Sequence, residues 1–127
     1  MKSSMLSWYK YHKDTKEMER YRNRNFNNLE AMINIHNIII ERPDEVRLSV
    51  MLLSVERMLN QINFYQDEIA KIDRIVVDFK GNEERLNKYG RALMNNYIAI
   101  QDELRDIIDT LRDCISGIQE QINSKEL

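Results

Sequence analysis

Carboxylate side chains at helical spacing are the first residues in this chain that could do chemistry. Five of them lie within twelve residues of one another near the C-terminal end: Asp102, Glu103, Asp106, Asp109 and Asp113. Glu103 and Asp106 have the E-x-x-D separation, which puts two carboxylates on the same face of a helix. Oxygen ligands in such a pair could hold a hard divalent cation such as Mg²⁺.

The pattern supplies only half of a magnesium site. All-α nucleotide pyrophosphohydrolases hold Mg²⁺ with two carboxylate pairs on neighbouring helices, and this chain contains no E-x-x-E segment. Arg105 and Arg112 also neutralise part of the acidic row. We interpret this row as a solvated acidic face, which could also bind a basic partner. A Mg²⁺-dependent nucleotide pyrophosphohydrolase is kept as a remote alternative.

A basic and aromatic segment at the N-terminus is the second candidate. Residues 1–28 hold seven Lys and Arg against three acids, although the whole chain has a net charge of −2. Cations neutralise phosphates and aromatic rings stack on unpaired bases, so this segment could contact nucleic acid or an acidic partner. Alternatively, the rings and the long cationic stems cover apolar surface. No helix-turn-helix pattern is present. The candidate binding residues are Trp8, Tyr9, Lys10, Tyr11, Lys13, Lys16, Arg20, Arg22 and Arg24.

Other reactive side chains have structural interpretations. His36 lies on the apolar side of its predicted helix, where a hydrogen-bonded core histidine is commoner than a metal ligand. Cys114 is the only cysteine, so the chain has no internal disulfide, and its apolar position predicts a small buried side chain. The sequence has no phosphate loop, dinucleotide-binding glycine turn or serine elbow. We therefore predict no catalytic residue, metal site or cofactor.

The elements that carry these residues are predicted to be helices. The 127 residues are 43% hydrophobic and 31% charged, as in an ordered protein, and one Pro and three Gly are too few for the turns of a β fold. We expect an N-terminal arm at 1–13 and a bundle at 14–127, with helices at about 15–41, 44–80 and 82–124. Asp14 and Glu17 resemble a capping box at the start of the first helix, and Pro43 suits the first turn of the second helix. Gly81 predicts a left-handed end to the second helix, and Asn82 predicts an N-cap for the third.

Apolar heptads predict how the helices pack. Helix 44–80 has an unbroken apolar seam at ten positions, typical of a long helical hairpin with a coiled-coil-like interface. A third apolar row on the last helix, Ile108, Ile115 and Ile122, predicts contact with two partners. At the beginning of helix 44–80, where all three helices should converge, five further residues widen the seam: Val46, Val50, Leu52, Leu53 and Leu59. The seam comprises Leu48, Met51, Val55, Met58, Ile62, Tyr65, Ile69, Ile72, Val76 and Phe79.

The predicted architecture is an all-α, elongated, antiparallel three-helix bundle. Because the first helix is expected to be the shortest, part of the seam near Gly81 should be uncovered, and a homodimer would cover it. The chain has no apolar run long enough to span a membrane and no secretory signal pattern, which predicts a cytoplasmic protein. We predict a non-enzymatic helical adaptor, inhibitor or assembly regulator, of phage or viral type, that binds a protein partner. A nucleic-acid-associated regulator is the alternative.

Overall fold

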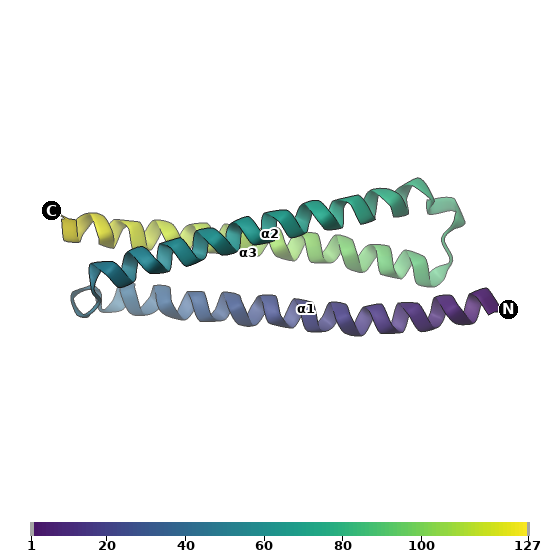
Figure 1. The fold of residues 1–127 in the computed structure, drawn as a ribbon, viewed down its shortest axis with the longest axis horizontal. Coiled ribbons are helices and arrows are strands. Elements are labelled where there is room, and N and C mark those ends of the chain that lie inside the picture. Colours follow the sequence, from purple (N-terminus) through teal and green to yellow (C-terminus); the bar gives the residue numbers. More distant parts are fainter. Residues whose placement is uncertain (1, 127) are drawn as a thin grey trace.

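Three long helices make up the computed structural model, which describes the backbone of residues 2–126 and the side chains of residues 14–126. They are α1 (Lys2–Glu41), α2 (Leu48–Gly81) and α3 (Lys88–Glu126), and the short 3-10 helices η1 (Pro43–Glu45) and η2 (Glu83–Arg85) lie in the two connections. Residues 2–126 contain no strand. Helix α2 runs antiparallel to α1 and α3, so the all-α helical bundle is confirmed (Figure 1).

Helix α3 is the centre of the bundle. It packs along both α1 and α2, whereas α1 and α2 touch each other little. Its apolar rows are therefore buried on two sides, and Leu104, Leu111 and Ile118 have no exposed surface at all. The prediction that a third apolar row on this helix meets a second partner is confirmed, since Ile108 and Ile122 are both buried.

Helix α1 begins at Lys2, thirteen residues before the start predicted near residue 15. The local capping signal of Asp14 and Glu17 does not start a helix here, because no Gly or Pro precedes Pro43 to interrupt the turns before it. The helix therefore has 40 residues, and the expectation that it is the shortest of the three is wrong. Its first turns lie at the same end of the bundle as the α2–α3 connection (Figure 1).

The α2–α3 connection is longer than the predicted tight hairpin. Gly81 remains in α2, and no glycine in the described range has a positive φ, so the predicted left-handed helix end is wrong. Asn82 ends α2, because its Nδ2 donates to the Asp78 carbonyl at 3.0 Å. Asn87 performs the capping role predicted for Asn82: its Oδ1 accepts the Gly90 N–H at 2.8 Å, which satisfies a free donor in the first turn of α3.

In the α1–α2 connection, helix α2 also starts later than predicted. Pro43 opens the single 3-10 turn η1 instead of continuing into α2. Val46 (φ −106°, ψ 127°) and Arg47 (φ −69°, ψ 146°) are then extended, and α2 begins at Leu48, four residues after the predicted start. The half-buried Val46 side chain packs against the core. This apolar contact explains why the chain leaves helical geometry at the corner before α2 begins.

A glycine lets α1 approach α3 closely near the corner. The His36 ring of α1 lies over Gly117 of α3, where a Cβ atom would be 2.8 Å from His36 Nε2 and 3.4 Å from Ile40 Cδ1. The other ring nitrogen, Nδ1, is 3.1 Å from Asn37 Oδ1. His36 is thus half-buried against a neighbouring helix, as its apolar-side position predicts.

Two glycine substitutions should have opposite effects on stability because of this contact. Gly81→Ala places the new methyl group in open space, so the helix propensity of Ala should stabilise the chain by about 0.5 to 1 kcal/mol. Gly117→Ala should give no such gain, because its methyl group displaces the His36 ring. Thermal unfolding of both variants measures the difference. In a His36→Ala background, Gly117→Ala should stabilise, and an equal gain for both glycine changes in the natural background would contradict the close approach.

Candidate interaction surfaces

The ten predicted seam residues all lie in or against the core of a single chain. Six are buried: Met51, Met58, Ile62, Tyr65, Ile72 and Val76. The other four are half-buried and pack against that core: Leu48, Val55, Ile69 and Phe79. Covering the seam therefore requires no second chain. Any interface with a partner has to use other surfaces, or the outer edges of the half-buried seam residues.

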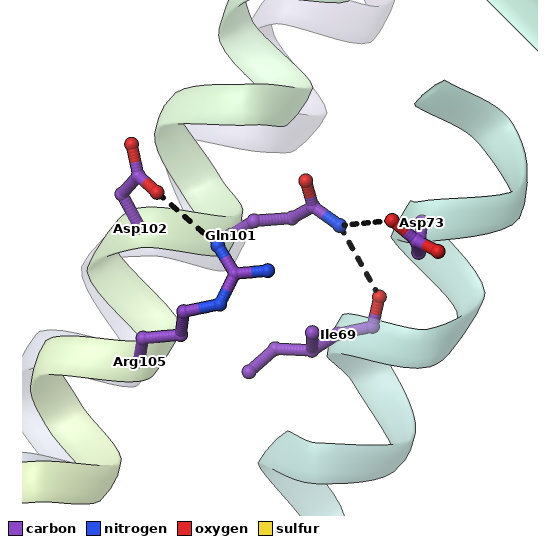
Figure 2. A network of polar contacts seen from close by, with 5 residues as sticks. All are labelled: Ile69, Asp73, Gln101, Asp102 and Arg105. Carbon is purple, nitrogen blue, oxygen red and sulfur yellow. Dashed lines mark hydrogen bonds and ion pairs between the residues drawn. The ribbon is translucent and has the colours of Figure 1, made fainter. Parts of the chain in front are cut away.

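A buried amide fixes α3 against α2 at the middle of the seam. Gln101 is 5% exposed, and its Nε2 donates to the Ile69 carbonyl at 3.4 Å and to Asp73 Oδ1 at 3.5 Å (Figure 2). A buried amide that found no partner here would cost stability, so these bonds favour one register of the two helices. Sequence reasoning missed Gln101, although a polar residue inside an apolar helical face is the signal that could have revealed it.

Large apolar side chains remain exposed mainly on α2. Among residues 14–126, ten large hydrophobic side chains are exposed, and seven of the ten belong to α2 whereas none belongs to α3. The residues that widen the seam at the start of α2 divide: Val46 packs against the core, whereas Leu52 and Leu59 keep 49% and 48% of their surface exposed. The seven are Val50, Leu52, Leu53, Leu59, Phe64, Ile75 and Val77.

Four of the apolar residues on α2 form a continuous row, which we call the outer stripe: Leu48, Leu52, Val55 and Leu59. Their spacing of four, three and four residues puts them on one side of the helix. Asp73, two heptads after Leu59, lies against Gln101 of α3, so the outer stripe borders α3. Its two exposed members, Leu52 and Leu59, make it an apolar helix edge that the described part of the chain covers only in part.

The basic candidates divide into two groups. Arg22 points at α3, where its Nε donates to Glu103 Oε2 at 2.9 Å and a second nitrogen pairs with Glu103 Oε1. Lys16, Arg20 and Arg24 are exposed, four residues apart on one side of α1. The remaining candidates lie outside the residues whose side chains are described: Trp8, Tyr9, Lys10, Tyr11 and Lys13. Their backbone continues α1.

The acidic row of α3 is held largely in ion pairs. Glu103 pairs with Arg22, and the exposed pairs Arg105–Asp102 and Arg112–Asp109 measure 3.2 and 3.9 Å (Figure 2 shows the first of these two). Within the described part of the chain, no group of three His, Cys, Asp or Glu side chains is placed to hold a metal ion. The E-x-x-D pair of Glu103 and Asp106 therefore finds no second pair on α1 or α2 among these residues.

The lone cysteine is buried in the face of α3 that the sequence predicts. Burial raises the pKa of the Cys114 thiol, and the neighbouring Asp113 carboxylate raises it further. Both effects disfavour the thiolate, which is the nucleophilic form. Cys114 thus acts as a small apolar side chain in the core.

A groove with acidic edges lies where the three helices meet, and residues 14–21 of α1 form one of its walls. Its volume is about 320 Å³, and apolar side chains from every helix line it, including Met18, Ile72 and Ile100. The Tyr21 hydroxyl donates to Glu68 Oε1 at 3.3 Å across the groove. Burial, followed by the Glu68 charge, raises the pKa of Tyr21 to about 12. Sequence reasoning missed this site, because its lining comes from three helices far apart in the chain.

The tyrosine from α3 experiences the same acidic surroundings. Burial raises the pKa of Tyr97, and the charges of Asp14 and Glu17 on α1 raise it further. A third tyrosine, Tyr65, has a pKa raised by its burial in the core. Two phenol groups in the groove are therefore kept neutral beside carboxylates.

No helix formed by residues 2–126 is both long and apolar enough to cross a membrane. Comparisons of this chain with protein-family models, with curated proteins and with solved structures found no match.

Proposed function

We propose that this chain is a non-enzymatic protein-interaction module, a small adaptor, inhibitor or assembly regulator that works as a homodimer joined through the outer stripe of α2. The observation that carries the proposal is the outer stripe itself, where Leu52 and Leu59 keep 49% and 48% of their surface exposed on one side of α2. Monomeric proteins rarely expose contiguous apolar patches, and such patches commonly mark protein interfaces.

The spacing of the outer stripe supports a helix as its partner. Apolar residues four and three positions apart form the knobs and holes by which two helices pack. A second copy supplies the same pattern, and an isologous interface needs only one self-complementary surface. The proposed interface extends the helix packing already present inside the chain, because Leu48 and Val55 belong both to the seam and to the outer stripe.

The size of the face indicates which neighbouring residues must take part. The outer stripe spans the 12 residues from Leu48 to Leu59. At about 1.5 Å per residue it is about 18 Å long and, at about 10 Å wide, offers roughly 180 Å². Standard interfaces bury about 800 Å² on each partner. The edge of α3 beside the stripe, which carries Arg105 and Arg112 in ion pairs with acids one turn away, supplies further area and a polar rim.

The exposed basic row on α1 is the feature that would serve nucleic-acid contact instead. Lys16, Arg20 and Arg24 remain available, but Arg22 is engaged with Glu103, and the acids Glu17 and Glu19 are exposed on the same helix. Because these acids offset the positive charge close to the row, the apolar face of α2 favours a protein partner over a phosphate backbone.

Molecular mass in solution tests the proposal. Light scattering after gel filtration should give twice the 15.3 kDa chain mass at micromolar concentration. Leu52→Glu together with Leu59→Glu should restore the single-chain mass, because burying two carboxylates in an apolar interface is costly. Ile38→Glu is the matched control, since Ile38 is 55% exposed but lies on α1. A monomeric natural chain, or dissociation caused equally by Ile38→Glu, would contradict the proposal; circular dichroism verifies that each variant is folded.

A further inference from the structure

The acidic groove at the three-helix junction is a second surface, distinct from the outer stripe. It exists because α1 and α2 both pack on α3 but touch each other little, which leaves a valley between them. Its floor is apolar, with Met18, Ile72 and Ile100 buried beneath Tyr97 and Ile75. A floor of this kind accepts aliphatic or aromatic groups rather than a hydrated ion.

The edges of the groove have an excess of negative charge. Asp14, Glu17 and Glu68 line it against one amine, Lys71. Lys71 Nζ lies 3.4 Å from Glu68 Oε2, so that one pair is internally neutral. Among the side chains described, Asp14 and Glu17 have no cationic partner within ion-pair distance. Two carboxylates beside an apolar floor therefore make the described edge of the groove acidic, which attracts an incoming cation.

The aromatic walls match the same chemistry. Tyr21 and Tyr97 both line the groove, and the neutral phenol rings present π faces that attract ammonium and guanidinium groups. Their raised pKa values agree with an acidic, partly dehydrated setting. An apolar floor, neutral aromatic rings and two available carboxylates together select a ligand with an apolar stem and a positive end.

We propose that this groove binds a basic side chain, Arg or Lys, presented with neighbouring apolar residues by a helical segment of a different protein. Charge complementarity identifies this occupant: the apolar stem contacts Ile72 and Ile75, and the cation reaches Asp14 and Glu17. This inference rests on the proposed interaction module and specifies that its protein partner carries a basic side chain. The site does not require the outer stripe to form a dimer.

Peptide titration tests the site directly. The probe is a helical peptide of about 15 residues with Leu and Arg four positions apart, and the control probe has Glu at each Arg position. NMR titration of the full chain should show saturable shifts of the Met18 methyl and of the Tyr21 and Tyr97 ring signals with the Arg peptide. The Glu peptide should produce no such shifts.

Matched variants locate the charges responsible. Asp14→Asn together with Glu17→Gln should weaken binding of the Arg peptide by about tenfold, since two favourable charge contacts are lost. Glu30→Gln together with Glu41→Gln removes two exposed acids elsewhere on α1 and should leave the affinity unchanged.

Equal binding of the Arg and Glu peptides, or equal weakening by both variant pairs, would overturn the proposal. Binding of propylguanidinium without binding of the Arg peptide would also overturn it, because the groove would then select small amines. Dimer mass is measured separately, so failure of this site is distinguishable from failure of the homodimer.

Discussion

Replacing Leu104 with Ala is expected to lower the free energy of unfolding by about 3 to 5 kcal/mol. Leu104 is fully buried at the middle of α3, the helix on which both other helices pack. Removing its branched end leaves a cavity that neighbouring side chains can fill only in part, so lost contacts add to the lost apolar burial. Because a domain of this size has a total stability of about 5 to 15 kcal/mol, one such change removes a large part of it.

Urea unfolding followed by far-ultraviolet circular dichroism measures this loss. Leu53→Ala is the matched control, because it deletes the same atoms from a side chain that is 47% exposed on α2 and lies outside the outer stripe. In the single chain the control should change stability by less than about 1 kcal/mol, since Ala is also a better helix former than Leu. Similar losses for the two variants would show that α3 is not the central helix.

The sequence predicted which side of α2 and of α3 is buried, because hydrophobic periodicity over many turns records the packing directly. On α2, no seam residue is exposed, and the extra row on α3 correctly predicted its two partners. These patterns persist for more than 30 residues. One misplaced turn cannot reverse the side of the helix that they indicate.

Helix ends were predicted less well, because several local signals compete for each of them. Asn82 and Asn87 are both good N-caps by type, and residue type alone does not show that Asn82 bonds back to α2 while Asn87 caps α3. Half-buried Leu86 lies between the two asparagines, and it is extended (φ −73°, ψ 133°) immediately before the Asn87 cap. Val46 is likewise half-buried and extended shortly before the start of α2. In both connections, an extended apolar residue two positions before the helix moves its start beyond the predicted one.

The groove could not be predicted from any single pattern. Its edges come from residues about 50 and 80 positions apart in the chain, such as Glu17, Glu68 and Tyr97. Periodicity fixes the rotation of each helix about its own axis, but it does not fix how far one helix slides along another. The pairing of Arg22 with Glu103 and the bonds of Gln101 supply that offset, and both depend on side chains placed by the fold.

Alkaline pH should destabilise the bundle through its buried tyrosines, and Tyr21 should contribute most to this effect. An unfolded tyrosine has a pKa of about 10, whereas the folded chain raises the pKa of Tyr21 to about 12. Below pH 10 the phenol is protonated in both states, and its preference for the folded state is fully present. Above that pH the unfolded chain releases the proton first, so stability falls as pH rises from about 10 to 12. The shift corresponds to at most about 3 kcal/mol, reduced by solvent screening because Tyr21 is half-buried.

Tyr21→Phe isolates this contribution. At neutral pH the variant loses the hydrogen bonds of the phenol to Glu68 and Asn25, which should cost about 1 kcal/mol each or less. Because phenylalanine has no proton to release, its stability should fall less steeply between pH 10 and 12, and the two curves should converge or cross. Urea unfolding at several pH values gives the stability of the natural chain and of the variant as a function of pH. Lysine deprotonation affects both chains equally, so the difference between the two curves reports on Tyr21. Parallel curves would mean that Tyr21 titrates alike in the folded and unfolded states, and the acidic groove would then not hold its phenol neutral.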